Sequence, residues 1–388
     1  MPSAFLADLP PRHSDPLRRA IDAAYHQDEA AAVDGLLAEL RFDPATAERV
    51  RARARRLSER LRTEAAHAVG VEAFMHAYSL DTHEGVMLMC LAEALLRVPD
   101  AETQEKLIRD KIGDVDWQRR VAQSDSFLIN ASAFGLMLSG RVMQWDRPAE
   151  DLPGRLRGLV GRLGEPVVRE AMRQAMRIMG HQFVLGQTID QAIDRAKRMR
   201  ELGFRYSYDM LGEGAKTAED AARYFQAYHA ALQRIGATAP KTAFFDRPSL
   251  SIKLSALHPR YEFAKWRRLQ DELLPGLIGL LAAARRIGIA ITVDAEETDR
   301  LEPSLDLFER LAAHPDLAGW NGLGLAVQAY QKRAVHVIPW LAELARRTSR
   351  QIPVRLVKGA YWDTEVKRAQ QLGVADYPVF TRKVASDV

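Results

Sequence analysis

Short apolar runs alternate with helical segments in the second half of the chain. The runs cover residues 250–254, 288–294, 322–328 and 352–358, and helices are expected at 217–236, 263–286, 303–313 and 332–348. Strands that alternate with helices form βαβ units, whose strands pair in parallel. The sequence therefore predicts an α/β fold, either a (β/α)8 barrel or a doubly wound sheet.

The first two hundred residues have the pattern of helices alone. Helices are expected at 17–40, from Asp43-Pro44 to 62, and at 84–98, 102–112, 115–123, 125–145, 154–162 and 165–202. We therefore place a helical arm at 1–65, a helical domain at 66–202 and the α/β domain at 203–388. The arginines between Arg49 and Arg62 favour a solvated helix over a nucleic-acid site, since no aromatic residues are interleaved with them.

Composition excludes several classes of protein. The formal net charge of +4 is too small to imply a nucleic-acid partner by itself. A single cysteine, Cys90, excludes a disulfide framework and a cysteine-rich metal site, and is expected to be an inert core thiol. No apolar run reaches the roughly 18 residues of a membrane span, and the N-terminus does not read as a signal peptide. We expect a cytoplasmic protein without a metal.

Each expected strand carries a polar residue toward its C-terminal end. These residues are Lys253, Asp294, Gln328 and Arg355. In barrels and in doubly wound sheets alike, ligands bind at the carboxyl ends of the strands. One such residue could simply cap a strand, but four in series with complementary charge favour a site. A buried lysine would need a partner such as the aspartate.

The fourth unit, from Val354 to Asp363, is the richest in chemistry. Arg355 is followed by Gly359, which lets a backbone approach a ligand closely, and by the aromatic pair Tyr361-Trp362. This pattern suits a flat, anionic, redox-active cofactor; the alternative is a glycine turn with core aromatics. His258, in the first βα loop, is expected to be structural. The pair Gly322-Leu-Gly324 lacks the third glycine of a dinucleotide fingerprint.

These motifs together resemble a known family. The segments that carry the resemblance are Ser207-Tyr-Asp-Met, Ser251-Ile-Lys-Leu-Ser-Ala-Leu-His-Pro, Val293-Asp-Ala-Glu-Glu, Val327-Gln-Ala-Tyr-Gln-Lys-Arg, Val354-Arg-Leu-Val-Lys-Gly-Ala-Tyr-Trp and Tyr377-Pro-Val-Phe-Thr-Arg-Lys, with the residues that directly follow some of them. From about residue 66 to 388 the sequence closely resembles the proline dehydrogenase region of the bacterial bifunctional proline utilization A flavoproteins.

The resemblance implies a fold, a reaction and a set of site residues. The fold would be a helical arm, a helical domain and a distorted (β/α)8 barrel, of which about the first four βα units are present. The reaction would be oxidation of L-proline to Δ1-pyrroline-5-carboxylate by hydride transfer to N5 of non-covalently bound FAD, with electrons passed to a quinone. The catalytic residues would be Lys253, Asp294, Arg355 and Tyr361. The cofactor would contact Asp209, Met210, Gln328, Arg355, Val357, Lys358, Gly359, Ala360, Tyr361, Trp362, Phe380, Thr381 and Lys383.

The sequence also departs from this family. It lacks the Arg-Arg-x-x-Glu motif that clamps proline, the aldehyde dehydrogenase domain and an evident ribbon-helix-helix module. We therefore expect an N-terminal piece of a larger flavoenzyme, with an open sheet edge that favours self-association. Two alternatives stay open: a barrel enzyme that forms a Schiff base on Lys253, and a non-catalytic fragment or DNA-binding regulator acting through the Arg49–Arg62 helix. A homo-oligomer and a peripheral membrane contact also stay open.

Overall fold

The structure is a computed structural model that describes residues 13–40, 43–66, 103, 184–210 and 214–388. The chain divides into two compact units, one of residues 42–195 and one that joins residues 1–41 to residues 196–388. Cys90 and the helices expected between 84 and 183 lie outside the described residues. The domain boundaries at 65 and 202 stay predictions.

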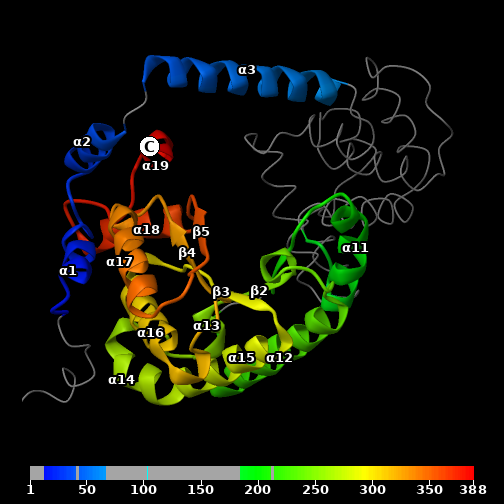
Figure 1. The fold of residues 1–388 in the computed structure, drawn as a ribbon. Coiled ribbons are helices and arrows are strands. Elements are labelled where there is room, and N and C mark those ends of the chain that lie inside the picture. The colour runs from blue at the N-terminus through cyan, green and yellow to red at the C-terminus, as the bar shows by residue number, and fades with distance from the viewer. Residues whose placement is uncertain (1–12, 41–42, 67–102, 104–183, 211–213) are drawn as a thin grey trace, which may run out of the picture. The chain divides into compact units, whose positions relative to one another are not determined.

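A five-stranded parallel sheet forms the centre of the second unit (Figure 1). Its strands lie in chain order: β1 (Ser207–Asp209), β2 (Ser249–Ile252), β3 (Ala290–Val293), β4 (Leu323–Gln328) and β5 (Val354–Val357). The α/β half-barrel expected from the sequence is confirmed. The sequence does not indicate β1, which lies where a loop is expected, because three residues are too few to show an alternating pattern.

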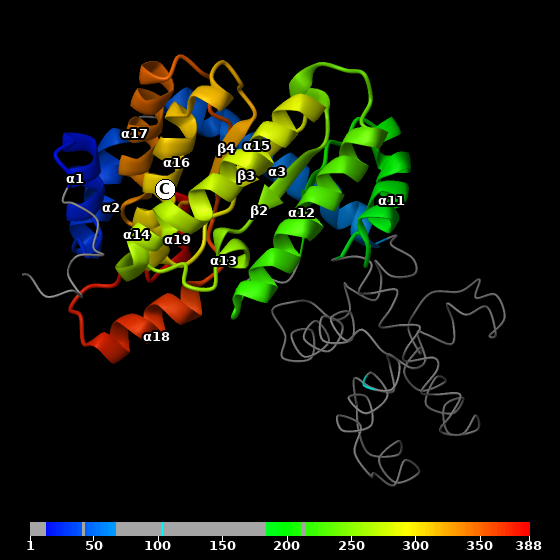
Figure 2. The same ribbon diagram turned by 90° about the horizontal axis from the view of Figure 1, so that it is seen from below.

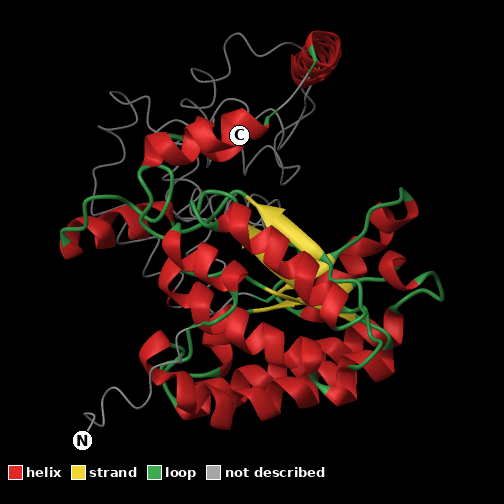
Figure 3. Cartoon of the chain, turned by 60° about the vertical axis from the view of Figure 1, so that its left-hand side comes forward, coloured by secondary structure: helices red, strands yellow, loops and turns green. Residues whose placement is uncertain are grey.

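Four helices form a layer that covers the sheet: α12 (Ala218–Thr238), α15 (Leu274–Ile287), α16 (Leu301–Ala313) and α17 (Ala334–Arg347). They are drawn red beside the yellow strands in Figure 3. Leu280 and Leu281 of α15 and Ile291 and Leu323 of the strands are fully buried, so the core lies between these two layers. Each side chain of this size stabilises the fold by about 1.5–3 kcal/mol when it leaves water.

Local sequence signals set the ends of these helices. Thr217 and Asp220 form the expected capping box at the start of α12, each side chain bonding the other's backbone N–H. Helix α15 ends at Gly288, whose φ of 78° is the left-handed conformation that glycine adopts without strain. These caps fix where the chain leaves a helix and enters the next strand.

The helix expected at 263–286 is not one uniform α-helix, although all of its residues are helical. Turns of 3-10 helix (Phe263–Lys265), α-helix (α14, Trp266–Arg268) and π-helix (Leu269–Leu273) lead without a gap into α15. Pro275 lies in the first turn of α15. It has no N–H to donate to the preceding turn, which accounts for the change of helix type there.

The arm is likewise not one continuous helix. Helix α1 (Pro16–Ala23) ends before a turn, and α2 (Glu29–Glu39) begins after Asp28, whose carboxylate caps it. Figures 1 and 2 both show α1 beside α17. The buried Arg18 lies over the ring of Trp340 in α17, 5.3 Å from its centroid. Its Nη2 also donates to Glu302 at 2.6 Å and to Asp306 at 2.8 Å, both in α16, so Arg18 ties α1 to two helices of the layer.

The described residues form several further elements. Helix α3 (Pro44–Ala66) carries the arginine run, α11 (Ile189–Glu201) precedes β1, and α13 (Leu254–Leu257) follows β2. Helix α18 (Trp362–Leu372) follows β5, and α19 (Lys383–Asp387) comes last. Three 3-10 turns complete the set: η1 (Phe244–Asp246), η4 (Thr298–Arg300) and η5 (Pro315–Leu317).

Candidate active site

Four charged side chains meet at the carboxyl edge of the sheet, that is, at the C-terminal ends of its parallel strands. Lys253 directly follows β2 and Asp294 directly follows β3. Lys253 Nζ donates to Asp294 Oδ2 at 3.0 Å and to Asp209 Oδ1 at 2.7 Å, and Arg355 Nη2 donates to Asp294 Oδ1. The predicted residues from four different strands therefore form one connected cluster.

Arg355 lies nearer the start of its strand than the sequence predicted, so its side chain has to reach along the strand to the other charged groups. It is the second residue of β5 and pairs with Ala326 in the middle of β4. Its long side chain spans the remaining rise of the strand, about 3.3 Å per residue. On the way, Arg355 Nη1 donates to Ser251 Oγ at 2.8 Å.

The cluster includes serines that the sequence analysis missed. The hydroxyls of Ser207 and Ser251 lie 3.0 Å apart and extend the polar side of the sheet below the ion pairs. Ser251 lies two residues before Lys253, and Ser207 two before Asp209. Residues at this spacing face the same side of a strand, so the periodicity of the expected strand at 250–254 was the signal that could have found Ser251. No strand was expected at 207–209, so Ser207 had no such signal.

Burial sets the strength of the ion pairs. The side chains of Lys253 and Asp294 are only 9% and 8% exposed, whereas those of Arg355 and Asp209 are 39% and 43% exposed. Burial also lowers the pKa of Arg355, and the Asp209 carboxylate partly opposes this. The cluster thus has a dry centre and an outer side that solvent, or a ligand, can reach.

A tyrosine behind the cluster was also missed. Tyr228 is buried in α12, and its hydroxyl accepts the Lys253 N–H at 3.2 Å. Burial raises the pKa of Tyr228 to about 12, so this hydroxyl stays neutral. It therefore fixes the backbone from which the Lys253 side chain leaves the strand.

Gln328, the last residue of β4, bridges two loops at the same edge. Its Nε2 donates to the carbonyl of Glu296 at 2.8 Å, and its Oε1 accepts the Ala360 N–H at 3.3 Å. The Glu296 carboxylate, also missed, accepts the Ser255 N–H at 3.0 Å and Arg300 Nη1 at 2.6 Å. Backbone groups thus occupy both ends of the Gln328 amide.

The turn after β5 has the special backbone expected at Gly359. Its φ is 134°, and a Cβ there would lie 2.4 Å from the Tyr330 ring. The close neighbour of this glycine is thus an aromatic ring of the protein. Trp362 is 42% exposed and donates its Nε1–H to the carbonyl of Phe380 at 2.9 Å.

The other expected cofactor residues lie at or near the ends of strands and helices. Lys358 pairs with Asp387, and Thr381 donates its N–H and its hydroxyl to the Glu29 carboxylate of α2, at 3.0 and 3.1 Å. Met210 follows β1, Val357 ends β5, Tyr361 precedes α18 and Lys383 begins α19. Their roles toward a cofactor stay predictions.

The residues present fit a flavin in two respects. The ring of a flavin gains negative charge on reduction, and the cluster offers the partly exposed Arg355 guanidinium. The ring of Trp362, in the same βα unit, is also exposed. Further along, the two Thr381 donors already hold an anionic group, the Glu29 carboxylate, and a phosphate would use the same donors.

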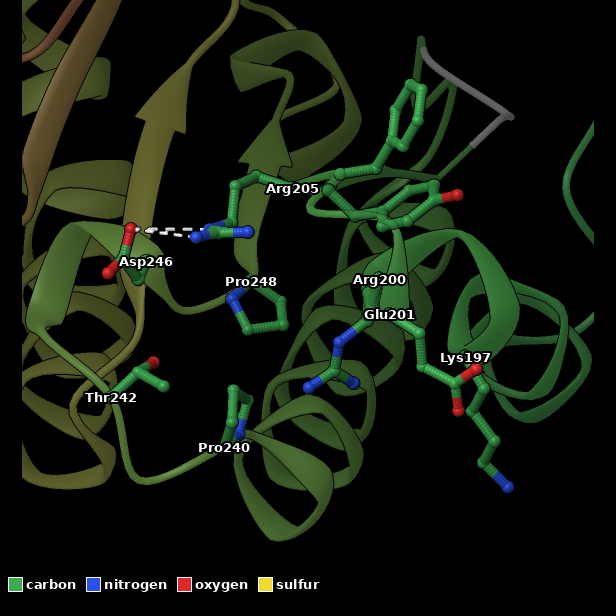
Figure 4. A pocket seen from close by; sticks show the side chains of 10 residues that line it. Lys197, Arg200, Glu201, Arg205, Pro240, Thr242, Asp246 and Pro248 are labelled. Carbon is green, nitrogen blue, oxygen red and sulfur yellow. Dashed lines mark hydrogen bonds and ion pairs between the residues drawn. The ribbon is translucent and has the colours of Figure 1, made fainter.

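A separate hollow of about 440 Å³ lies at the opposite edge of the sheet (Figure 4). Its walls include Arg205 and Tyr206, which precede β1, and Pro248, which precedes β2. Arg205 is bound to Asp246 at 3.1 Å within it. Because it lies at the amino ends of the strands, this hollow is not the site formed by the charged cluster.

Three other features bear on the expected chemistry. His258 is buried and structural, as expected: its Nε2 lies 3.1 Å from Glu272 Oε2, and its Nδ1 accepts the Arg260 N–H. Within the described ranges, no group of three His, Cys, Asp or Glu side chains is placed to hold a metal ion. No helix in the described part of the chain has the length and apolarity needed to span a bilayer.

The fold and the cluster define an α/β barrel protein with its charged site at the carboxyl edge of the strands. Three family models match the chain: "Proline utilization A proline dehydrogenase N-terminal domain" at 15–62, "DNA-binding domain of Proline dehydrogenase" at 70–183, and "Proline dehydrogenase" at 192–388. The last covers half of the chain. The chain belongs to the proline dehydrogenase family, which is flavin-dependent in general.

Individual relatives agree with this assignment. The chain is 48% identical to the bifunctional protein PutA of Salmonella typhimurium over 374 residues, which are 96% of the chain and 28% of that protein. It is 28% identical to proline dehydrogenase 1 of Bacillus subtilis over 186 residues, which are 48% of the chain and 53% of that protein. The expected likeness to proline utilization A is confirmed, and the chain spans less than a third of the PutA relatives' length.

Solved structures give the same result. A mutant of proline utilization A from Bradyrhizobium japonicum matches with a TM-score of 0.67 and 47% identity, over 98% of this chain and 37% of that one. The Bdellovibrio bacteriovorus protein inactivated by N-propargylglycine matches with a TM-score of 0.54 and 22% identity over 78% of this chain and 31% of that one. The second match supports the fold alone.

Proposed function

We propose that the chain carries the proline dehydrogenase site of a PutA-type flavoenzyme and oxidises L-proline to Δ1-pyrroline-5-carboxylate with FAD. The observation that carries the proposal is the cluster of Lys253, Asp294 and Arg355 at the carboxyl edge, in a chain of this family. FAD, when bound, would supply the hydride acceptor. Transfer of the electrons to a quinone, at a peripheral membrane contact, belongs to the same proposal.

The protein's own residues would bind and orient the reactants. The Lys253 ammonium would hold the proline carboxylate, and Asp294 would keep both cations in place. Arg355, whose side chain is partly exposed, would stabilise negative charge on the cofactor ring. Gln328 would contribute by holding Ala360 against the loop of Glu296.

The same geometry argues against Schiff-base chemistry on Lys253. A nucleophilic lysine must lose its proton, which a neighbouring cation or an apolar pocket favours. Two carboxylates lie within 3.0 Å of Lys253 Nζ and favour the charged ammonium instead. The Schiff-base alternative also predicts covalent trapping of a carbonyl substrate by borohydride, which the proposed function does not.

The test is the absorbance spectrum of the purified chain after reconstitution with FAD, with and without L-proline. We expect a protein-bound flavin whose visible absorbance bleaches when proline is added. Arg355→Met should slow the bleaching about a hundredfold, as the loss of one charge-stabilising donor does elsewhere. Lys253→Ala should raise the proline concentration needed for half-maximal bleaching about tenfold or more.

Lys367→Ala is the matched control, because Lys367 is exposed on α18. It should leave flavin content and bleaching unchanged. A chain that takes up no flavin, or Lys253→Ala and Arg355→Met variants that behave as the unmodified chain does, would overturn the proposal.

DNA binding is the second candidate function. One matching family model is described as the DNA-binding domain of proline dehydrogenase. In addition, the arginines of α3 between Arg49 and Arg62 are all exposed. Binding of a labelled duplex that weakens steeply with salt, and weakens further on Arg55→Gln/Arg56→Gln, would support this role. Binding unaffected by that change would remove α3 from it.

A further inference from the structure

A buried carboxylate links two loops of the site without touching the charged cluster. Glu365, in the first turn of α18, is fully enclosed. Its Oε1 accepts the Thr298 N–H at 2.7 Å and its Oε2 accepts the Thr298 hydroxyl at 2.6 Å. Thr298 begins η4, at the end of the loop that follows β3, and is itself buried.

The two linked segments both carry residues of the candidate site. The loop after β3 begins with Asp294 and includes Glu296, while the turn after β5 leads through Ala360 into α18. The Glu365 N–H donates to the carbonyl of Tyr361 at 2.9 Å. Glu365 therefore lies one helical turn after Tyr361, one of the expected cofactor residues. Gln328 joins the same two segments from the side of the sheet.

Thr298 is also held from the opposite side. Its carbonyl accepts Arg333 Nη2, and its hydroxyl lies 3.3 Å from that of Tyr25 in the arm. The Arg333 guanidinium in turn stacks over the Tyr25 ring at 4.1 Å. The η4 end of the link is therefore fixed to the body of the domain, and α18 is the element that the link positions.

We propose that Glu365 is a positioning residue of the cofactor site, one that holds the turn after β5 at a fixed position against the loop after β3. A buried carboxylate is costly unless it is fully hydrogen-bonded. Here burial, together with the nearby Asp299 and Glu297 carboxylates, raises the pKa of Glu365. An apolar contact would join α18 to η4 without that cost, but it would not fix the direction of the helix as two hydrogen bonds to one residue do.

The same two elements offer a matched control. Arg368, one turn further along α18, pairs with Asp299 of η4 at 2.7 Å, and both side chains are solvent-exposed. Exposed pairs contribute little to stability. Arg368→Gln thus removes a contact between the same elements and leaves the buried link intact.

The first experiment needs no cofactor. Amide hydrogen exchange is followed in peptides from 296–302 and 359–372 of the flavin-free chain, for Glu365→Ala, Glu365→Gln and Arg368→Gln. Loss of the link should speed exchange about tenfold or more in both peptides of Glu365→Ala. Glu365→Gln, whose amide can make both hydrogen bonds after the Thr298 hydroxyl rotates, should exchange nearly as the unmodified chain does. Arg368→Gln should do the same.

The second experiment rests on the proposed function and uses the FAD-reconstituted chain. Glu365→Ala should bind FAD about tenfold more weakly and shift the visible absorbance maximum of the flavin that remains bound. A residue that only stabilised the fold would reduce the amount of holoprotein without changing that spectrum. Thr298→Val, which removes one of the two bonds, is the milder variant if Glu365→Ala does not fold, and Thr298→Ser should restore the spectrum.

The outcomes separate the two proposals. No flavin uptake by the unmodified chain refutes the proposed function, while exchange in the flavin-free chain still tests the link. An unchanged flavin spectrum and affinity in Glu365→Ala and Thr298→Val refutes the positioning role. Exchange that rises in Arg368→Gln as much as in Glu365→Ala also refutes it.

Discussion

The buried ion pair between Lys253 and Asp294 makes a quantitative prediction about stability. Both side chains are less than 10% exposed, and their charged atoms lie 3.0 Å apart. Asp294→Asn leaves Asp209 as the carboxylate beside the Lys253 ammonium, and that carboxylate is 43% exposed. Breaking a buried pair from one side typically costs 3–5 kcal/mol, and the remaining partner places the cost here at about 3 kcal/mol.

Lys253→Met should cost less, about 1.5 kcal/mol. Asp294 keeps the Arg355 guanidinium in that variant, so no buried charge is left alone. The double variant Lys253→Met/Asp294→Asn should cost about as much as Asp294→Asn by itself, since the methionine side chain needs no counter-charge. The expected coupling between the two sites is therefore about 1.5 kcal/mol.

The assay is urea unfolding of the four proteins, followed by far-ultraviolet circular dichroism at constant pH and salt. Lys367→Met serves as a control for loss of an exposed lysine and should lie within about 0.5 kcal/mol of the unmodified chain. If the effects of the two single changes add up to that of the double variant within about 0.5 kcal/mol, the two groups do not interact. That result would refute the reasoning about the buried ion pair.

Three further predictions concern the turn, the link and the arm. Gly359→Ala should destabilise the chain by about 2 kcal/mol or more, because of its positive φ and the Tyr330 ring; a change below about 0.5 kcal/mol in the same urea assay would contradict this. The raised pKa of Glu365 means that the folded state holds its proton at higher pH than the unfolded state does. The contribution of this group to the free energy of unfolding therefore falls as pH rises above about 4.5. Above that pH, Glu365→Gln should become more stable relative to the unmodified chain; curves of unfolding free energy against pH that run parallel for the two proteins would contradict this. Arg18→Ala leaves two carboxylates facing each other and should free α1, so limited trypsin digestion should cut at Arg19 faster; an unchanged rate would show that the arm is held elsewhere.

The strands could be predicted from the sequence because each is an apolar run between helices. The four expected runs overlap β2 to β5, and the polar residues that follow β2 and β3 lie where parallel pairing puts them. The boundaries were less accurate, since Arg355 is near the start of β5. The segment expected to be helical at 263–286 is so throughout, but Pro275 lies where its helix type changes, and only the structure shows the π-helical turn that precedes it.

The links that join distant segments could not be predicted. Thr298 and Glu365 are 67 residues apart, and Arg18 and Glu302 are 284 apart. Neither pair has a local spacing that marks it, because the contact is created by the packing of elements. By contrast, Ser251 was within reach of the sequence, since it lies two residues before Lys253 in an expected strand. Ser207 was not, because β1 lies where the sequence predicts a loop.

The charge balance of the cluster distinguishes its two carboxylates. Lys253 and Arg355 face Asp209 and Asp294, so the formal charges of these four side chains balance. An anionic ligand that binds Lys253 therefore competes with the two carboxylates for its ammonium group. Asp294 is buried and holds both cations, and moving it would take a counter-charge from each of them. Asp209 accepts from Lys253 and is 43% exposed, so water can solvate it when it moves away. On the proposed function, therefore, Asp294 is the fixed anchor of the site and Asp209 is the group that the substrate carboxylate displaces.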